Sequence, residues 1–233
     1  MTSDFSGVRP GGWTHDGRSV VYVGVDSVGG LGALHEIRAR PWDGSGVPVV
    51  LVRRNEGLAE VSITAARGYL AVGVGVSTFV PGDIWLMPLG GSGTLAPFVA
   101  TPAAEWFMRF SPSGQYLAYV SNETGKTEVY VKPVPGPGGR LQVSSGGGDE
   151  PVWAPGDREL FYRTPTHLVT ATLSLGTNMT VVRRDTLFAD TYARGWINYD
   201  VFPNGREFVM IKGLATTGKF EVILNWQALL RKP

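Results

Sequence analysis

The sequence predicts an all-β chain of about five four-stranded antiparallel sheets, the blades of a β-propeller. The first observation is a recurring plan: a large apolar anchor residue, a short turn of small or turn-forming residues, and an apolar strand. The second is spacing, because the anchors are 50, 47, 43 and 48 residues apart, which is the period of propeller blades. The third is that no stretch has the apolar periodicity of a helical repeat. The five anchors are Trp13, Ile63, Phe110, Trp153 and Val201.

A single domain over residues 1–233 accommodates these blades at about 8–54, 58–101, 105–145, 149–190 and 196–224. In blade one, the turn Asp16-Gly17 between apolar runs is a strong hairpin signal, since glycine adopts positive φ without steric cost. Blade two has lost this pair and turns through Ala65, Ala66, Arg67 and Gly68. The strands expected in these two blades are 9–14, 19–24, 34–39, 47–52, 61–64, 69–74, 84–88 and 95–100.

Blade three has the clearest copy of the plan, and its run Pro135–Gly139 must lie at a blade edge because proline cannot donate to a ladder. The strands expected in blades three and four are 107–111, 115–121, 128–133, 141–144, 151–154, 159–164, 167–173 and 180–187. Blade five has strand signals only at 198–202, 207–212 and 220–224, and residues 225–230 favour a short helix. Three arrangements remain open for its missing strand: a weakly closed ring, a fragment of a larger ring, or edge-mediated pairing in a homo-oligomer.

Composition excludes several classes of function. The net charge is +1, so the chain lacks the excess of positive charge with which proteins bind nucleic acids or anionic membranes. Cysteine is absent, which removes disulfides, zinc-thiolate sites and thiol nucleophiles. Residues 1–12 lack a signal-peptide h-region, and no apolar run is long enough to cross a bilayer. We therefore expect no membrane contact within this chain and leave its compartment open: cytoplasmic, or extracytoplasmic if it belongs to a membrane receptor.

The run from Ser111 to Arg163 resembles the TolB-type, WD40-like propeller repeat, whose hallmark is a Trp-Ser-Pro-Asp-Gly-like turn. The segments Leu117–Gly125, Glu128–Val131 and Ser144–Gly148 are similar to the propeller that follows the kinase domain and membrane span of some bacterial receptor-like serine/threonine kinases. This resemblance implies a sensing or protein-binding module. It does not imply kinase activity, because the chain has no His-Arg-Asp loop and no Asp-Phe-Gly.

The mouth of the propeller channel is the strongest candidate site. Positions three residues before each anchor should meet at one rim, and they include Glu60, Glu150 and Asn198. Carboxylates there could hold a basic peptide end or a cation such as calcium, although chance placement of solvated loop acids is the simpler explanation. The candidate rim residues are Glu60, Glu105, Trp106, Asp149, Glu150, Trp196 and Asn198.

Other chemical motifs are weaker. Gly29–Gly32 is followed by no helix, so we interpret it as a hairpin loop rather than a phosphate site. His15, His35 and His167 fall in different blades and do not predict a metal triad. We expect no cofactor. We also expect Trp42, Trp85, Trp106, Trp196 and Trp226 to pack in or between blades, although Trp106 and Trp196 could instead project at the rim.

Two functions are compatible with these observations. The first is a non-catalytic module that offers one rim to a protein or small ligand, as part of a signalling protein. The second is a propeller enzyme of the glycosidase or lyase type, which would need two facing carboxylates about 5–10 Å apart. The acids available for that role are Glu60, Glu105, Asp149, Glu150 and Asp200.

Overall fold

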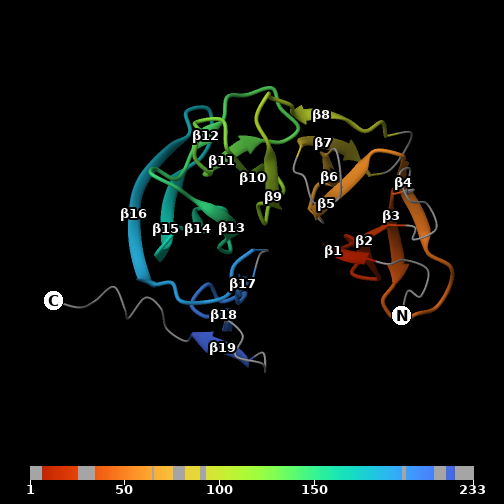
Figure 1. Cartoon of the computed structure of the whole chain (residues 1–233). Coiled ribbons are helices and arrows are strands. Elements are labelled where there is room, and N and C mark those ends of the chain that lie inside the picture. The colour runs from red at the N-terminus through yellow and green to blue at the C-terminus, as the bar shows by residue number, and fades with distance from the viewer. Residues whose placement is uncertain are drawn as a thin grey trace. The chain divides into compact units, whose positions relative to one another are not determined.

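A computed structural model describes residues 7–25, 35–64, 66–75, 82–89, 93–195, 198–212 and 219–223. It confirms the predicted all-β propeller fold: five antiparallel sheets, of which four have four strands and the last has three among the described residues (Figure 1). The first sheet contains β1 (Gly7–Trp13), β2 (Ser19–Val25), β3 (His35–Pro41) and β4 (Val49–Arg54). The second contains β5 (Gly57–Thr64), β6 (Tyr69–Gly75), β7 (Asp83–Pro88) and β8 (Ala96–Val99).

The remaining sheets follow the same plan, in which consecutive strands are neighbours. The third contains β9 (Glu105–Phe110), β10 (Tyr116–Ser121), β11 (Glu128–Pro133) and β12 (Leu141–Gln142). The fourth contains β13 (Asp149–Trp153), β14 (Glu159–Arg163), β15 (His167–Ser174) and β16 (Thr180–Ala189). The fifth contains β17 (Tyr199–Val201), β18 (Phe208–Lys212) and β19 (Lys219–Ile223). The predicted helix over 225–230 lies outside the described residues.

In four blades the turn after the anchor is closed by the same backbone hydrogen bond: the amide of Thr14 donates to the carbonyl of Ser19 at 2.9 Å, and the amide of Ser111 donates to that of Tyr116 at 2.8 Å. Within the turn of blade one, the amide of Gly17 donates to the carbonyl three residues earlier, that of Thr14, at 2.9 Å. In blade two, where Asp-Gly is absent, the amide of Gly68 donates to the carbonyl four residues earlier, that of Thr64, at 3.3 Å. The hairpin therefore forms in blade two through a different turn.

Bulges recur in the inner and outer strands of several blades. The inner strands β1, β5 and β13 each shift register, and Phe107 and Glu150 adopt φ of 51° and 49° three residues before their anchors. The outer strands shift as well, and Leu51, Phe98 and Leu187 are the extra residues at these shifts. A bulge increases local twist and re-aims side chains. Neither set follows from residue type, and the sequence did not predict them.

The chain divides into two compact units, residues 1–110 and 111–233. In the first unit, Val21 and Val23 of β2 belong to the same buried apolar cluster as Leu70 and Val72 of β6. In the second, Phe161 of β14 packs against Phe208 of β18, with ring centroids 4.8 Å apart. Alternate residues of each strand thus face one neighbouring sheet, and burial of this apolar surface stabilises each pair of blades.

One packing prediction is wrong. Trp42 was expected to pack in or between blades, but its side chain is 67% exposed in the turn between β3 and β4. Trp196 and Trp226 lie outside the described residues. The first blade's outer strand also ends later than the predicted 47–52, at Arg54. In the ranges that the structure describes, no helix has the length and apolarity that a membrane span needs.

Candidate functional site

Glu60 of β5 joins two sheets of the first unit. Its Oε2 accepts a hydrogen bond from the backbone amide of Phe107 in β9 at 2.7 Å. Its Oε1 lies 3.4 Å from a guanidinium nitrogen of Arg109. Burial raises the pKa of the Glu60 carboxyl, and the charge of Arg109 and the Phe107 amide offset this only in part. The position predicted for the rim is therefore occupied by a carboxylate that links neighbouring inner strands.

Glu150 of β13 has the equivalent role in the second unit. Its Oε2 accepts from the backbone amide of Asn198 at 3.3 Å, just before β17, and from Arg163 Nη1 at 2.9 Å. The carbonyl of Glu150 accepts from the hydroxyl of Tyr199 at 2.7 Å. Burial raises the pKa of the Glu150 carboxyl, against the opposing effect of Arg163.

The two links share one repeat position. Phe107 follows Glu60 by 47 residues and Asn198 follows Glu150 by 48, close to one blade in each case. Each carboxylate thus accepts from the matching backbone position of the next inner strand. A buried amide without such a partner costs about 1–3 kcal/mol, so these acids have a structural use that requires no ligand.

Arg163 is the centre of the larger network. Its side chain is fully buried, and its guanidinium donates to both carboxylate oxygens of Asp190 at 2.6 and 2.7 Å. It also donates to the carbonyl of Ala193 at 2.6 Å, and Arg194 pairs with Asp190 from the surface. Although burial opposes ionisation, the hydrogen bonds and charge of Arg163 hold the pKa of Asp190 below its usual value.

The other candidate rim residues take separate positions. Glu105 is buried and accepts from Thr101 Oγ1 at 2.6 Å, and Trp106 lies beside it in β9 with its ring edge-on to Phe107. Asp149 accepts from the amide of Glu150 at 3.0 Å. The structure therefore brings together Asp149, Glu150 and Asn198 in the second unit, and Glu60 with the strand of Glu105 and Trp106 in the first. Trp196 lies outside the described residues.

Arg163 and Asp190 were not among the predicted site residues, although the sequence holds a signal for one of them. Ten residues after their anchors, blades one and three have Val23 and Val120, and blade five has Ile211. Arg163 occupies that apolar position in blade four. A charge at a core position of a repeat predicts a buried ionic partner. Asp190 follows β16, and nothing in its local sequence marks it.

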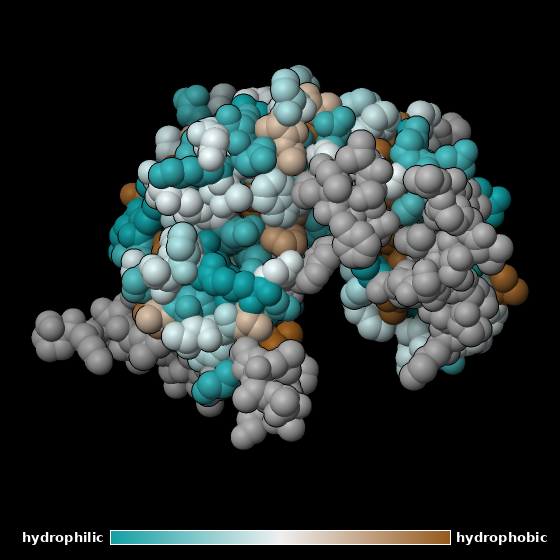
Figure 2. Space-filling model, in the orientation of Figure 1, coloured by the Kyte–Doolittle hydropathy of each residue, from teal (hydrophilic) through white to brown (hydrophobic). Residues whose placement is uncertain are grey.

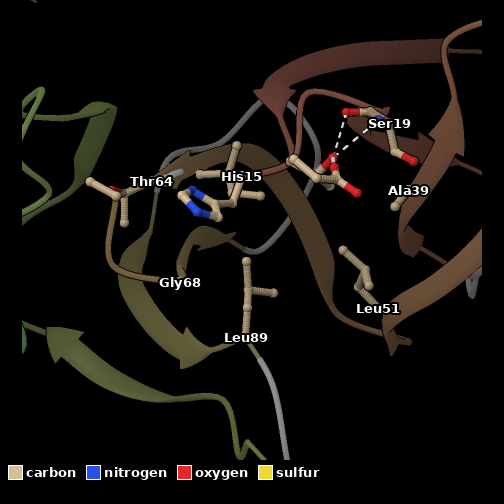
Figure 3. Close-up of a pocket in the computed structure, with 11 residues that line it drawn as sticks. His15, Ser19, Ala39, Leu51, Thr64, Gly68 and Leu89 are labelled. Carbon is tan, nitrogen blue, oxygen red and sulfur yellow. Dashed lines mark hydrogen bonds between the residues drawn. The ribbon is translucent and has the colours of Figure 1, made fainter.

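A pocket of about 640 Å³ lies between blades one and two (Figure 3). Its walls include the apolar side chains of Ala39, Leu51, Ile63 and Leu89. His15 and Asp16 of the exposed first turn border it, and Leu51 is the bulged residue of β4. The volume is in the range of small-molecule sites, which are usually apolar with a few polar groups. His15 is exposed, and no pattern in the sequence predicts this pocket.

The turn that borders the pocket is held in place by its own side chains. Thr14 Oγ1 donates to Asp16 at 2.7 Å and accepts from the amide of Ser19 at 3.0 Å, as Figure 3 shows for Ser19. Hydrogen bonds from Thr14 and the amide of Arg18 lower the pKa of Asp16. The pocket therefore has a fixed anionic group at its border. Elsewhere in the described ranges, no group of three or more His, Asp or Glu side chains is placed to hold a metal ion.

Comparison with solved structures shows that the chain has the fold of TolB-type β-propellers. TolB from Acinetobacter baumannii superposes with a TM-score of 0.68 at 13% identity, over 94% of this chain and 52% of that one. An oligogalacturonate lyase from Vibrio parahaemolyticus superposes with a TM-score of 0.67 at 11% identity, over 97% of this chain and 67% of that one. Proteins of different function thus share this fold.

Sequence comparison finds a local relative. Tricorn protease homolog 2 of Streptomyces coelicolor is 38% identical over 77 residues, which is 32% of this chain and 7% of that protein. No family model matches the chain. The chain therefore spans about half of the TolB structure and a small part of the Streptomyces protein.

Proposed function

We propose that the chain is a non-catalytic binding module whose ligand or protein partner enters the pocket between blades one and two. The observation that carries this proposal is the pocket itself: apolar walls, a volume of about 640 Å³, and an exposed border with His15 and Asp16. Loops and turns held on a rigid sheet scaffold are common binding elements. The acids of the inner strands favour binding over catalysis, because Glu60 and Glu150 already serve to connect sheets.

Filling the pocket tests the proposal. Ala66 is exposed and lines the pocket, so Ala66→Trp should occupy the space without disturbing the core. The probe is a mixture of small apolar compounds such as indole and isovaleramide, followed by amide NMR shifts. We expect shifts at His15, Gly68 and Leu89 in the unmodified chain and none in the variant. Ala96→Trp on β8, also exposed, is the matched control and should leave the shifts unchanged.

Two results would contradict the proposal: no compound shifts the pocket amides, or the shifts persist in Ala66→Trp. A separate assay addresses the enzyme alternative, since an oligogalacturonate lyase shares the fold. The chain is incubated with oligogalacturonate and divalent cations, and unsaturated product is followed by ultraviolet absorbance. Turnover by the unmodified chain that is lost in Glu150→Gln would show that the chain is an enzyme and would contradict a non-catalytic module.

We also propose that the module belongs to a bacterial signalling protein of the receptor serine/threonine kinase type. Support comes from the resemblance of Leu117–Gly125 and Ser144–Gly148 to the propellers of such kinases. Reading the coding sequence of the parent gene tests this: kinase motifs and a membrane span in the same reading frame are expected. A protease or transport domain there would contradict it.

A further inference from the structure

The outer strands of the four-stranded sheets differ in how they protect their edges. An outer strand presents backbone donors and acceptors that another strand can use, and proteins usually blunt such edges with proline, charge or shortness. β8 contains Pro97, β12 is two residues long, and β16 carries Arg183, Arg184 and Asp185. β4 begins with three apolar residues, Val49, Val50 and Leu51. Among these four edges, β4 lacks the usual protection over its first half.

The side chains of this edge are also exposed. Val47 is 85% exposed, Val49 60% and Val50 38%, and the exposed Trp42 lies in the preceding turn. Five of the seven large hydrophobic side chains that are exposed in the described residues belong to this blade, counting Trp13. Hydrophobic surface is visible at the right-hand edge of Figure 2, where Figure 1 places this blade. Contiguous exposed apolar surface of this kind marks interaction sites.

The two faces of β4 have different chemistry. Val49 lies opposite Ala39, which lines the pocket, and the bulged Leu51 lines it too. Val50 lies opposite Arg38, and Arg53 lies opposite Glu36. Because opposed residues share a face, the pair of strands β3 and β4 has a pocket face (Ala39, Val49) and an arginine face (Arg38, Val50, Arg53).

The arginine face carries excess positive charge. The buried carboxylate of Glu36 pairs with both Arg38 and Arg53, and their hydrogen bonds lower its pKa although burial opposes this. Arg40, two residues after Arg38 on the same strand, faces the same side. Three arginines thus lie on this face, and Glu36 pairs with two of them, Arg38 and Arg53. A strand placed beside β4 would meet apolar surface on one side and cations on the other.

We propose that β4 binds an extended segment of a partner protein in which apolar and acidic side chains alternate, added as a further strand of the first sheet. Its backbone pairs with the edge of β4, its apolar side chains cover Val49 and reach the pocket, and its acidic side chains approach Arg53 and Arg40. Strand addition of this kind takes affinity from backbone hydrogen bonds and specificity from alternate side chains. This inference rests on the proposed function, because the apolar side chains of the partner segment are placed in the proposed binding pocket.

The probe is a labelled, end-capped eight-residue peptide that alternates leucine with glutamate, with binding measured by fluorescence anisotropy. We expect Val49→Lys to weaken binding on the order of tenfold or more, because it places a charge on the apolar first half of the edge. Val182→Lys on β16 is the matched control, since Val182 is equally exposed, and it should have no effect. A peptide with lysine in place of glutamate should also bind less tightly.

Alternate backbone N-methylation of the peptide separates strand addition from pocket binding, because it removes the donors and keeps the side chains. We expect the methylated peptide to lose binding. Equal binding of both peptides, or no binding of either, would overturn strand addition, while the small-compound NMR assay would still report on the pocket. A dimer of the unmodified chain that Val49→Lys dissociates, seen by sedimentation, would identify the occupant as a second copy and also overturn the proposal.

Discussion

Glu60 and Glu150 occupy the same position of the repeat but compensate their charge in different ways. Both accept a hydrogen bond from the matching amide of the next inner strand. Glu60 lies 3.4 Å from Arg109, whose side chain is 36% exposed, and Glu60 itself is 16% exposed. Glu150 pairs with the fully buried Arg163, which is shared with Asp190. The hydrogen bond from the carboxylate to the backbone amide therefore recurs at the same repeat position, whereas the arginine that pairs with the carboxylate differs from blade to blade.

The burial of the ionic partner determines how much each contact contributes to stability. In the first unit, water can solvate the charges when the ion pair of Glu60 with Arg109 is lost, so this pair contributes little to the free energy of unfolding. In the second unit, water does not reach Arg163, and removal of any one partner leaves a buried charge. The predictions below test this contrast by removing the ionic partners and then the carboxylates.

Substitution of Arg163 should have the largest effect. Arg163→Met keeps the volume but leaves Asp190 and Glu150 as buried acids, with an expected loss of about 3–5 kcal/mol in the free energy of unfolding. Urea denaturation measures it. Arg183→Met is the control, because Arg183 pairs with Asp185 at the surface and should change stability by less than about 1 kcal/mol. Equal losses in both variants would show that burial of the network is unimportant.

Truncation of the two carboxylates comes next. Glu150→Ala removes the acceptor of the Asn198 amide and one partner of a buried arginine, with an expected loss of about 2–4 kcal/mol. Glu60→Ala should lose about 1–2 kcal/mol, since it removes the carboxylate acceptor of the Phe107 amide and one partner of the partly exposed Arg109. Thermal unfolding of both variants measures the difference. A Glu60→Ala loss as large as that of Glu150→Ala would contradict the comparison.

Repetition explains how much of this fold could be predicted from sequence. The anchors and turns recur, so the sheets and most strand bounds follow from them, and Glu60, Glu150 and Asn198 could be placed at one repeat position. Their pairing could not be predicted, because it depends on bulges that give Phe107 and Glu150 positive φ. The pocket and the exposed edge of β4 depend on how two sheets pack, which no local pattern of residues encodes.

The change of stability with pH should be the smallest of these effects. It should have opposite signs for Glu60, whose pKa is raised, and Asp190, whose pKa is lowered. Burial raises the pKa of Glu60, so between its unfolded and folded pKa values the unfolded chain loses its proton first and stability falls as pH rises. The pKa of Asp190 is lowered overall, so its contribution is present above the unfolded pKa and is lost as pH falls. The stability advantage of the unmodified chain over Glu60→Gln should shrink from acidic to neutral pH, and its advantage over Asp190→Asn should grow. Unfolding titrations across this range would contradict the assignment if both differences changed in the same direction.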